Sequence, residues 1–151
     1  MHDATDRRIL RHLLADPDAP NSDLAQRAGV TQASLWRRLD RMRATGIIAA
    51  IHGRIDWRAL GYEVQVSLRF TLDKTDPRAF DDFIAAAREV PEVLEIQTFL
   101  GSVDLRLSVI ARDMAHWQQI YRDRILRLPH VSDSDALMLV STIKDSVELA
   151  L

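Results

Sequence analysis

An unbroken alternation of apolar and polar side chains over residues 63–72 constrains the fold of this chain more than any other feature. Every second residue of the segment is apolar, namely Val64, Val66, Leu68, Phe70 and Leu72. Successive side chains of a β-strand point to opposite faces of the sheet, so this pattern predicts a strand with one buried face. A lone strand cannot bury that face, and we therefore expect a sheet.

The residues after this strand predict a helix, two strands, a second helix and a last strand. Asp76 and Pro77 suit the cap and the first residue of one helix, which Pro91 ends, and Asp113 suits the cap of the other. The expected strands are residues 93–100, 104–111 and 134–143. The order βαββαβ predicts an α+β, ferredoxin-like (ACT-like) domain, in which an antiparallel sheet has both helices on one face.

The face of this sheet that lies opposite the helices needs a cover. The apolar candidates for that face are Val93, Ile110, Leu137 and Leu139. Pairing with a second copy of the chain is the simplest way to cover them. We therefore expect at least a homodimer.

The first third of the chain predicts three short helices. Apolar side chains recur at helical spacing in residues 5–15, 21–28 and 31–46. Asn21 or Ser22 offers a side-chain cap to the second helix, Gly29 allows a tight turn, and Thr31 caps the third helix. Two short helices joined by a glycine turn are the helix-turn-helix pattern.

The third helix is expected to be a DNA recognition helix. Residues 1–54 contain nine Arg and six Asp with no Lys or Glu, a net charge of +3, whereas the remainder has a net charge of −5. Arginine suits both phosphate and guanine, so the basic side of this helix suits a major groove. We expect residues near the helix start to reach base edges and later arginines to bind phosphates. The expected DNA-contacting residues are Thr31, Gln32, Ser34, Arg37, Arg38, Arg41 and Arg54.

Residues 47–55 predict the wing of a winged helix-turn-helix. They read as two short strands with a turn at His52-Gly53, directly after the basic helix. Trp36, at the edge of that helix, is expected to be a partly buried packing residue. The alternative is an ordinary three-helix bundle with a solvated charged face, and the wing pattern favours DNA binding over it.

A short capped turn separates the two predicted domains. Asp56 suits its cap and Gly61 its end. We therefore divide the chain into a winged helix-turn-helix DNA-binding domain of residues 1–55, a hinge of residues 56–62, and a ferredoxin-like domain of residues 63–151.

The composition excludes several classes of protein. There is no cysteine, hence no disulfide framework and no thiolate metal site, and a cytoplasmic location is expected. No apolar run reaches membrane-spanning length. The five histidines are scattered without metal-ligand spacing, and there is no glycine-rich phosphate loop. We expect no catalytic residue, no metal, no cofactor and no membrane partner.

Several short segments share their order and spacing with one known family. They are Asp6-Arg7-Arg8-Ile9-Leu10, Asn21-Ser22-Asp23-Leu24-Ala25, Gly29-Val30-Thr31, Val90-Pro91-Glu92-Val93, Gly101-Ser102-Val103-Asp104, Leu128-Pro129-His130-Val131 and Ile143-Lys144-Asp145. Over essentially its whole length the chain resembles the Lrp/AsnC (leucine-responsive, or feast/famine) regulators. The resemblance implies a DNA-binding transcription regulator that forms dimers and often octamers, with amino acids or related small molecules bound between its sensor domains.

The resemblance also implies where an effector binds. The matching positions, on the hairpin loop and the last strand, are Gly101, Ser102, Val103, Asp104, Ser134 and Ala136. In such a loop the backbone amides can hold a carboxylate, and Asp104 can face an ammonium group. A plain hairpin turn is the alternative interpretation of this loop.

Some positions depart from the family pattern. Ser102 stands where an acidic or amide residue is usual, Ala136 where a hydroxyl is common, and Arg43 where glutamate is typical. The altered pocket residues keep open a ligand-independent architectural DNA-binding protein. An enzyme is a further alternative, because some proteins of this architecture are tetrapyrrole decarboxylases. The arginine-rich helix favours DNA over catalysis.

Overall fold

The computed structural model describes residues 3–145, which form two compact units. The first consists of residues 3–54 with residues 143–145, and the second of residues 55–142. No helix in residues 3–145 has the length and apolar composition needed to cross a membrane.

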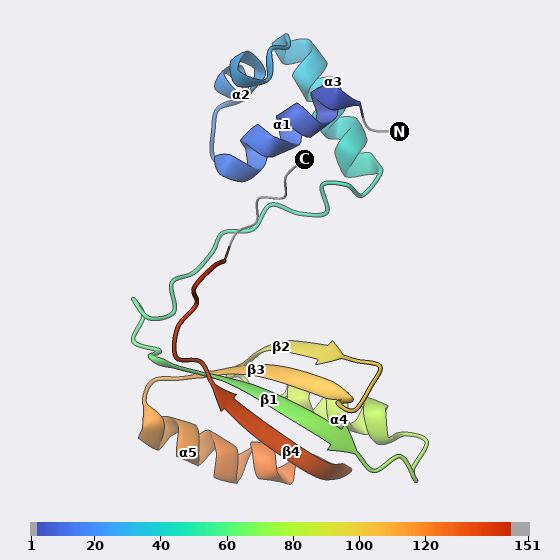
Figure 1. The fold of residues 1–151 in the computed structure, drawn as a ribbon, viewed down its shortest axis with the longest axis vertical. Coiled ribbons are helices and arrows are strands. Elements are labelled where there is room, and N and C mark those ends of the chain that lie inside the picture. Colours follow the sequence, from blue (N-terminus) through green and yellow to red (C-terminus); the bar gives the residue numbers. More distant parts are fainter. Residues whose placement is uncertain (1–2, 146–151) are drawn as a thin grey trace. The chain divides into compact units, whose positions relative to one another are not determined.

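The first unit is built from three helices, α1 (Ala4–Ala15), α2 (Asn21–Ala28) and α3 (Gln32–Ala44), seen in blue and cyan in Figure 1. One apolar cluster holds them together, and each member is at most 2% exposed: Ile9, Leu24, Ala25, Ala28, Leu35, Leu39 and Met42. The stripe predicted for the third helix is thus confirmed, and it faces the core.

Of three predicted helix-end residues in this unit, the structure confirms two. Gly29 ends α2 in the left-handed conformation, with φ 65°, and the Thr31 hydroxyl accepts a hydrogen bond from the Ser34 N–H. The predicted cap of α2 by Asn21 or Ser22 is wrong. Pro20 occupies the cap position without a side-chain bond, because both polar residues already lie inside the helix.

The wing strands expected in residues 47–55 do not form. The Ile47 and Ile48 N–H groups instead bond to the Met42 carbonyl and close the end of α3. Beyond them Ile51 and Ile55 are about half exposed, so pairing the segment would bury little apolar surface. A two-stranded hairpin without a buried face is only marginally stable, which explains the irregular backbone.

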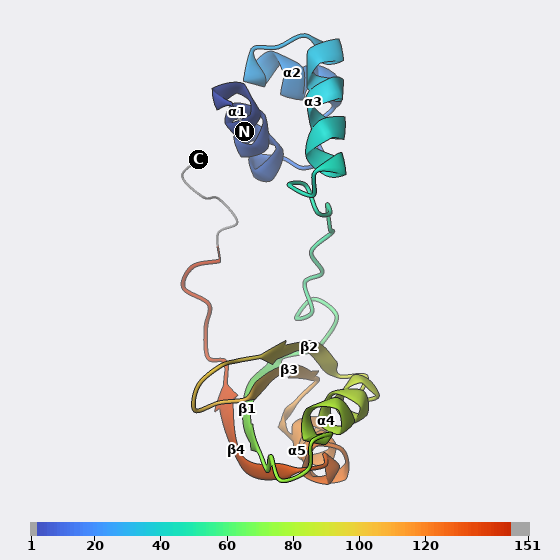
Figure 2. The same ribbon diagram turned by 90° about the vertical axis from the view of Figure 1, so that its right-hand side faces the viewer.

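The second unit is a four-stranded antiparallel sheet with the order β2-β3-β1-β4. Its strands are β1 (Val64–Leu72), β2 (Val93–Thr98), β3 (Leu105–Ala111) and β4 (Val131–Met138). Figures 1 and 2 show α4 (Ala79–Arg88) and α5 (Met114–Asp123) together on one face of the sheet. The predicted ferredoxin-like arrangement is confirmed.

The alternating segment that opens this domain forms β1, one of the two inner strands of the sheet. Val66, Leu68 and Phe70 of β1 are at most 1% exposed, and they lie opposite buried residues of β3 in register. The Phe70 ring lies 4.9 Å from the Phe83 ring of α4, centroid to centroid, so the strand and the helix share one core.

Several element boundaries differ from the predicted ones. Helix α4 begins at Ala79 rather than Pro77, because the Asp76 carboxylate accepts the Arg78 N–H and holds a turn there. Helix α5 stops at Asp123 and gives way to a 3-10 turn, η1 (Ile125–Arg127). Strand β4 begins at Val131 and ends at Met138, several residues earlier than expected.

The residues on the sheet face opposite the helices differ in part from the predicted ones. Val93 packs against the helix-side core, so its assignment to the open face is wrong. Ile110 is 6% exposed, whereas Leu137 and Leu139 are 46% and 41% exposed. Strand β4 is exposed along its whole length, so Leu137 and the adjoining Leu139 give this edge of the sheet accessible apolar surface.

A buried carboxylate joins the end of β1 to the loop between β2 and β3. Asp104 is 3% exposed, and its Oδ2 accepts the Leu72 N–H at 2.9 Å. Its Oδ1 lies 2.7 Å from the Lys74 ammonium. Burial alone would raise the pKa of Asp104, but the Lys74 ammonium and the Leu72 N–H outweigh it and hold that pKa below its ordinary value of 3.8.

The substitution Asp104→Asn is expected to destabilise the protein at neutral pH by about 1 to 2 kcal/mol, because Lys74 loses its partner while remaining partly hydrated. Since the folded-state pKa is lowered, the contribution of Asp104 is fully present above pH 3.8 and is lost as the pH falls through the folded-state value. Urea unfolding from pH 7 to pH 2 measures this effect. The exposed Asp133→Asn is the control, and an equal loss in both variants contradicts the assignment.

Candidate functional site

The surface of α3 divides into two parts. One side, with Arg38 and Arg41, lies against α1. The other side is open to solvent and includes Trp36, Arg37 and Arg43. The predicted basic face is therefore split between contacts inside the first unit and a surface free to meet a partner.

The side of α3 next to α1 is organised by a buried carboxylate. Asp6 is 0% exposed, with Oδ1 2.7 Å from Arg38 Nη1 and Oδ2 2.6 Å from Arg41 Nη2. Arg38 Nη1 also lies 2.8 Å from Asp3 Oδ2. We call Asp3, Asp6, Arg38 and Arg41 the Asp6 cluster.

The Asp6 cluster also caps α1. The Asp3 carboxylate accepts the Asp6 N–H at 2.8 Å, and the Asp6 carboxylate accepts the Asp3 N–H at 3.3 Å. The Asp6 N–H and the Arg38 guanidinium lower the pKa of Asp3, while Asp3 and Asp6 raise the pKa of Arg38. Arg38 is thus bound within the chain, whereas Arg41 is about half exposed and keeps donors toward solvent.

The open side of α3 differs from the sequence interpretation at Trp36. Trp36 is 63% exposed, so the prediction of a partly buried packing residue is wrong. Arg43 is exposed on the same side of the helix. Within residues 3–145, no ion pair or hydrogen bond engages the guanidinium of Arg37 or of Arg43. The sequence signal for Arg37 and Arg43 is their position on α3 outside the stripe of Leu35, Leu39 and Met42 that faces the core.

The remaining residues predicted to contact DNA lie at the two ends of this segment. Thr31 and Gln32 are exposed at the start of α3, and Ser34 is partly buried beside them. Arg54, after the irregular segment, is 77% exposed and has its guanidinium 2.5 Å from the Asp145 carboxylate. Thr31, Gln32 and Ser34 therefore lie together at the N-terminal, positive end of the α3 dipole, whereas Arg54 lies ten residues beyond the end of that helix.

A second candidate site is a hollow of about 380 Å³ beside the β2–β3 loop. We call it the hairpin hollow, and its lining residues are Arg69, Phe99, Leu100, Gly101, Ser102, Val103 and Arg106. Gly101 has φ 148°, a conformation that favours glycine. The Nε of Arg69 is buried and has no hydrogen-bond partner within the described chain. A donor in this state suits an anionic group that enters the hollow.

The predicted effector residues do not all reach this hollow. Gly101, Ser102 and Val103 line it, but the carboxylate of Asp104 is already bound to Leu72 and Lys74. Ser134 and Ala136 lie opposite Phe70 and Leu68 in register, on the helix side of β4, so they are not brought to it. Arg69 and Arg106, which the sequence interpretation missed, are brought there from two adjacent strands.

A group of metal-ligating side chains lies elsewhere in the second unit. Asp76, Asp82 and His130 each place one ligand atom within 4.8 Å of the others. His130 Nε2 and Asp82 Oδ2 are already 3.1 Å apart, and Asp76 accepts the Arg78 N–H. The contact between Asp82 and His130 links α4 to the turn before β4, and Asp76 holds the turn before α4, so each side chain already has a structural role.

Comparison with known proteins agrees with both units. Residues 2–49 match the family model of the winged helix-turn-helix DNA-binding domain, and residues 65–149 match that of the Lrp/AsnC ligand binding domain. The proline dehydrogenase transcriptional activator of Rhodobacter capsulatus is 30% identical over 93% of this chain and 92% of its own length. The leucine-responsive regulatory protein of Escherichia coli strain K12 is 26% identical over 99% and 91%, respectively.

Solved structures give the same result for the fold. The transcriptional regulator NMB0573 of Neisseria meningitidis, in complex with L-methionine, superposes with a TM-score of 0.90 at 26% identity, covering 99% of this chain and 96% of that one. An AsnC family transcriptional regulator of Agrobacterium tumefaciens has a TM-score of 0.85 at 28% identity, covering 97% and 95%. The chain therefore belongs to the Lrp/AsnC family of ligand-modulated, DNA-binding transcription regulators.

Proposed function

We propose that the open side of α3 binds operator DNA and that an amino acid in the hairpin hollow modulates this binding. The observation that supports the first part most directly is the pair of unengaged arginines, Arg37 and Arg43, on an exposed helix face. Thr31, Gln32 and Ser34 extend the same surface to the helix start, where the backbone dipole favours phosphate.

The proposed DNA contacts are not equal in kind. Arg37 is free to reach base edges, and Arg43 and the half-exposed Arg41 are suited to phosphates. Arg38, held by two carboxylates, acts mainly by fixing α3 against α1. Arg54 requires exchange of its Asp145 partner for a phosphate, which its exposed position allows.

Arg37→Ala is expected to weaken operator binding by about tenfold or more and to reduce the slope of log affinity against log salt by about 1, as loss of one DNA contact requires. Arg38→Ala should instead lower the stability of the first unit. Fluorescence anisotropy with the chain's own upstream DNA at several salt concentrations measures affinity, and urea unfolding measures stability. Arg122→Ala, in α5, is the control. Unchanged DNA affinity in Arg37→Ala contradicts the proposed contact.

The effector proposal is supported by the charge of the hairpin hollow. Arg69 and Arg106 line the hollow together with residues 99–103 of the loop, and guanidinium groups beside backbone amides suit an α-carboxylate. Arg69 pairs with Asp135 and Arg106 pairs with Glu95, so each guanidinium keeps further N–H donors for a ligand. The relative from Neisseria meningitidis was solved with L-methionine, which makes that amino acid the first to test.

L-Methionine at about 100 times its Kd should stabilise the full chain by about 2.7 kcal/mol, since a ligand that binds only the folded state acts by mass action. Arg69→Gln should abolish most of this shift, because the carboxylate loses its donor. Thermal unfolding with L-methionine, L-leucine and acetate measures the effect, and Arg88→Gln is the matched control. If no amino acid shifts the transition, the ligand-independent architectural function is favoured instead.

Self-association through the exposed edge of the sheet is the third part of the proposal. Leu137, Met138 and Leu139 are each more than two-fifths exposed in succession at the end of β4. An unpaired edge strand with a run of exposed apolar side chains is suited to a second copy of the chain. A homodimer at this edge would cover them, and further assembly to an octamer is compatible with it.

Leu137→Lys is expected to shift the chain from dimer toward monomer, because a buried unpaired ammonium opposes the contact. Analytical ultracentrifugation over a hundredfold range of concentration measures the change. Leu126→Lys places the same charge at an apolar residue of η1 that is 62% exposed and should leave assembly unchanged. Equal dissociation in both variants, or in neither, contradicts an interface at β4.

A further inference from the structure

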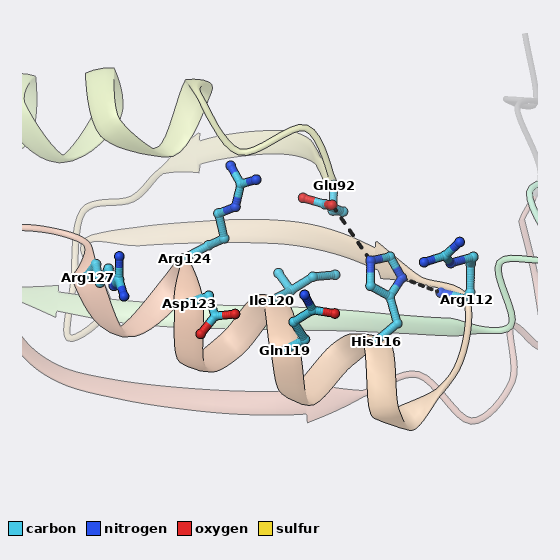
Figure 3. Close-up of a pocket in the computed structure, with 8 residues that line it drawn as sticks. All are labelled: Glu92, Arg112, His116, Gln119, Ile120, Asp123, Arg124 and Arg127. Carbon is cyan, nitrogen blue, oxygen red and sulfur yellow. Dashed lines mark hydrogen bonds and ion pairs between the residues drawn. The ribbon is translucent and has the colours of Figure 1, made fainter.

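A second pocket lies on the helix side of the sheet, away from the hairpin hollow. Figure 3 shows it along α5, and it has a volume of about 580 Å³. Its lining residues are Glu92, Arg112, His116, Gln119, Ile120, Asp123, Arg124 and Arg127. We call it the arginine pocket. Its volume lies within the range of ligand-binding sites, about 300 to 1,000 Å³.

The arginines of this pocket are at its two ends. In Figure 3, Arg112 lies beside His116 at the start of α5, whereas Arg124 and Arg127 lie at the other end of the helix. Within residues 3–145, none of the three guanidinium groups makes an ion pair or a hydrogen bond. Three unengaged arginines at one concave surface create a positive potential that favours anions.

The middle of the pocket has a different character. Ile120 is 3% exposed and forms an apolar floor. Above it lies Glu92, whose Oε1 is 3.8 Å from His116 Nε2 and whose Oε2 is buried without a hydrogen-bond partner in the described chain. The backbone N–H of Arg112 donates a hydrogen bond to His116 Nδ1 at 3.2 Å and fixes the orientation of the imidazole ring.

We infer that the arginine pocket binds a small organic anion with two acidic groups joined by a short linker. One acidic group pairs with Arg112 and the other with Arg124 and Arg127, while the linker lies on Ile120. Carboxylate and phosphate have the same charge-assisted donors available here, so both kinds of acid fit this chemistry. The pocket shares no residue with the proposed DNA surface or the hairpin hollow, and it does not rest on the function proposed for either.

A nucleic acid fits this pocket less well than a small dianion. Glu92 and Asp123 contribute two carboxylates to the lining, so a continuous chain of phosphates meets like charge between the arginines. A small molecule with charge only at its ends avoids this repulsion.

Isothermal titration calorimetry of the full chain at constant ionic strength tests the inference. The probes are adipate for paired carboxylates and fructose 1,6-bisphosphate for paired phosphates, with acetate and inorganic phosphate as single-group controls. At least one paired probe should bind at least tenfold more tightly than its single-group control, and the probe that does so identifies the type of acid.

Arg112→Gln and Arg124→Gln should each weaken the preferred probe by about tenfold, since each removes one charge-assisted contact. Arg88→Gln is the matched control, because Arg88 is exposed on α4 and does not line the pocket. An equal loss in Arg88→Gln, or equal affinity for paired and single acids, overturns the inference. So does a loss of DNA affinity in the Arg112 and Arg124 variants without any dianion binding.

Discussion

The position of α3, and with it the proposed DNA surface, depends on one buried carboxylate. Asp6 binds Arg38 and Arg41 across more than thirty residues of sequence, and it also completes the cap of its own helix. A buried charge is stable only when its partners are in place, so this contact holds α3 in one rotation about its axis. That rotation turns Arg37 outward. The orientation of the proposed DNA surface therefore depends on the partners of Asp6 as well as on the apolar core.

A comparable internal carboxylate organises the sensor unit. Asp104 joins the loop between β2 and β3 to the end of β1 through the Leu72 N–H and the Lys74 ammonium. The Asp104 carboxylate is therefore not among the groups that line the hairpin hollow, whereas Arg69 and Arg106 are, which is the basis of the proposed carboxylate site. Both units thus use a buried aspartate to fix a loop or a helix, and in both units arginines lie at the adjoining surface.

The unit that contains the sheet presents three surfaces with different chemistry. The end of β4 exposes a run of apolar side chains, the hairpin hollow is a basic loop site, and the arginine pocket is a basic site along α5. These surfaces lie on different elements of one small domain, so a second copy, an amino acid and a dianion need not compete for the same residues. The fold therefore has room for more than one signal to reach a single regulator.

Local patterns in the sequence were enough for the element order, the helix-turn-helix and the ferredoxin-like topology, because periodicity and glycine turns act over a few residues. The stripe of Leu35 and Leu39 and the alternation of β1 are examples. Tertiary structure alone decided which arginines are free: Arg38 and Arg41 find Asp6 only after α1 and α3 pack. It also decided that residues 47–55 form no strands, since strands need a partner and a buried face that local sequence does not supply.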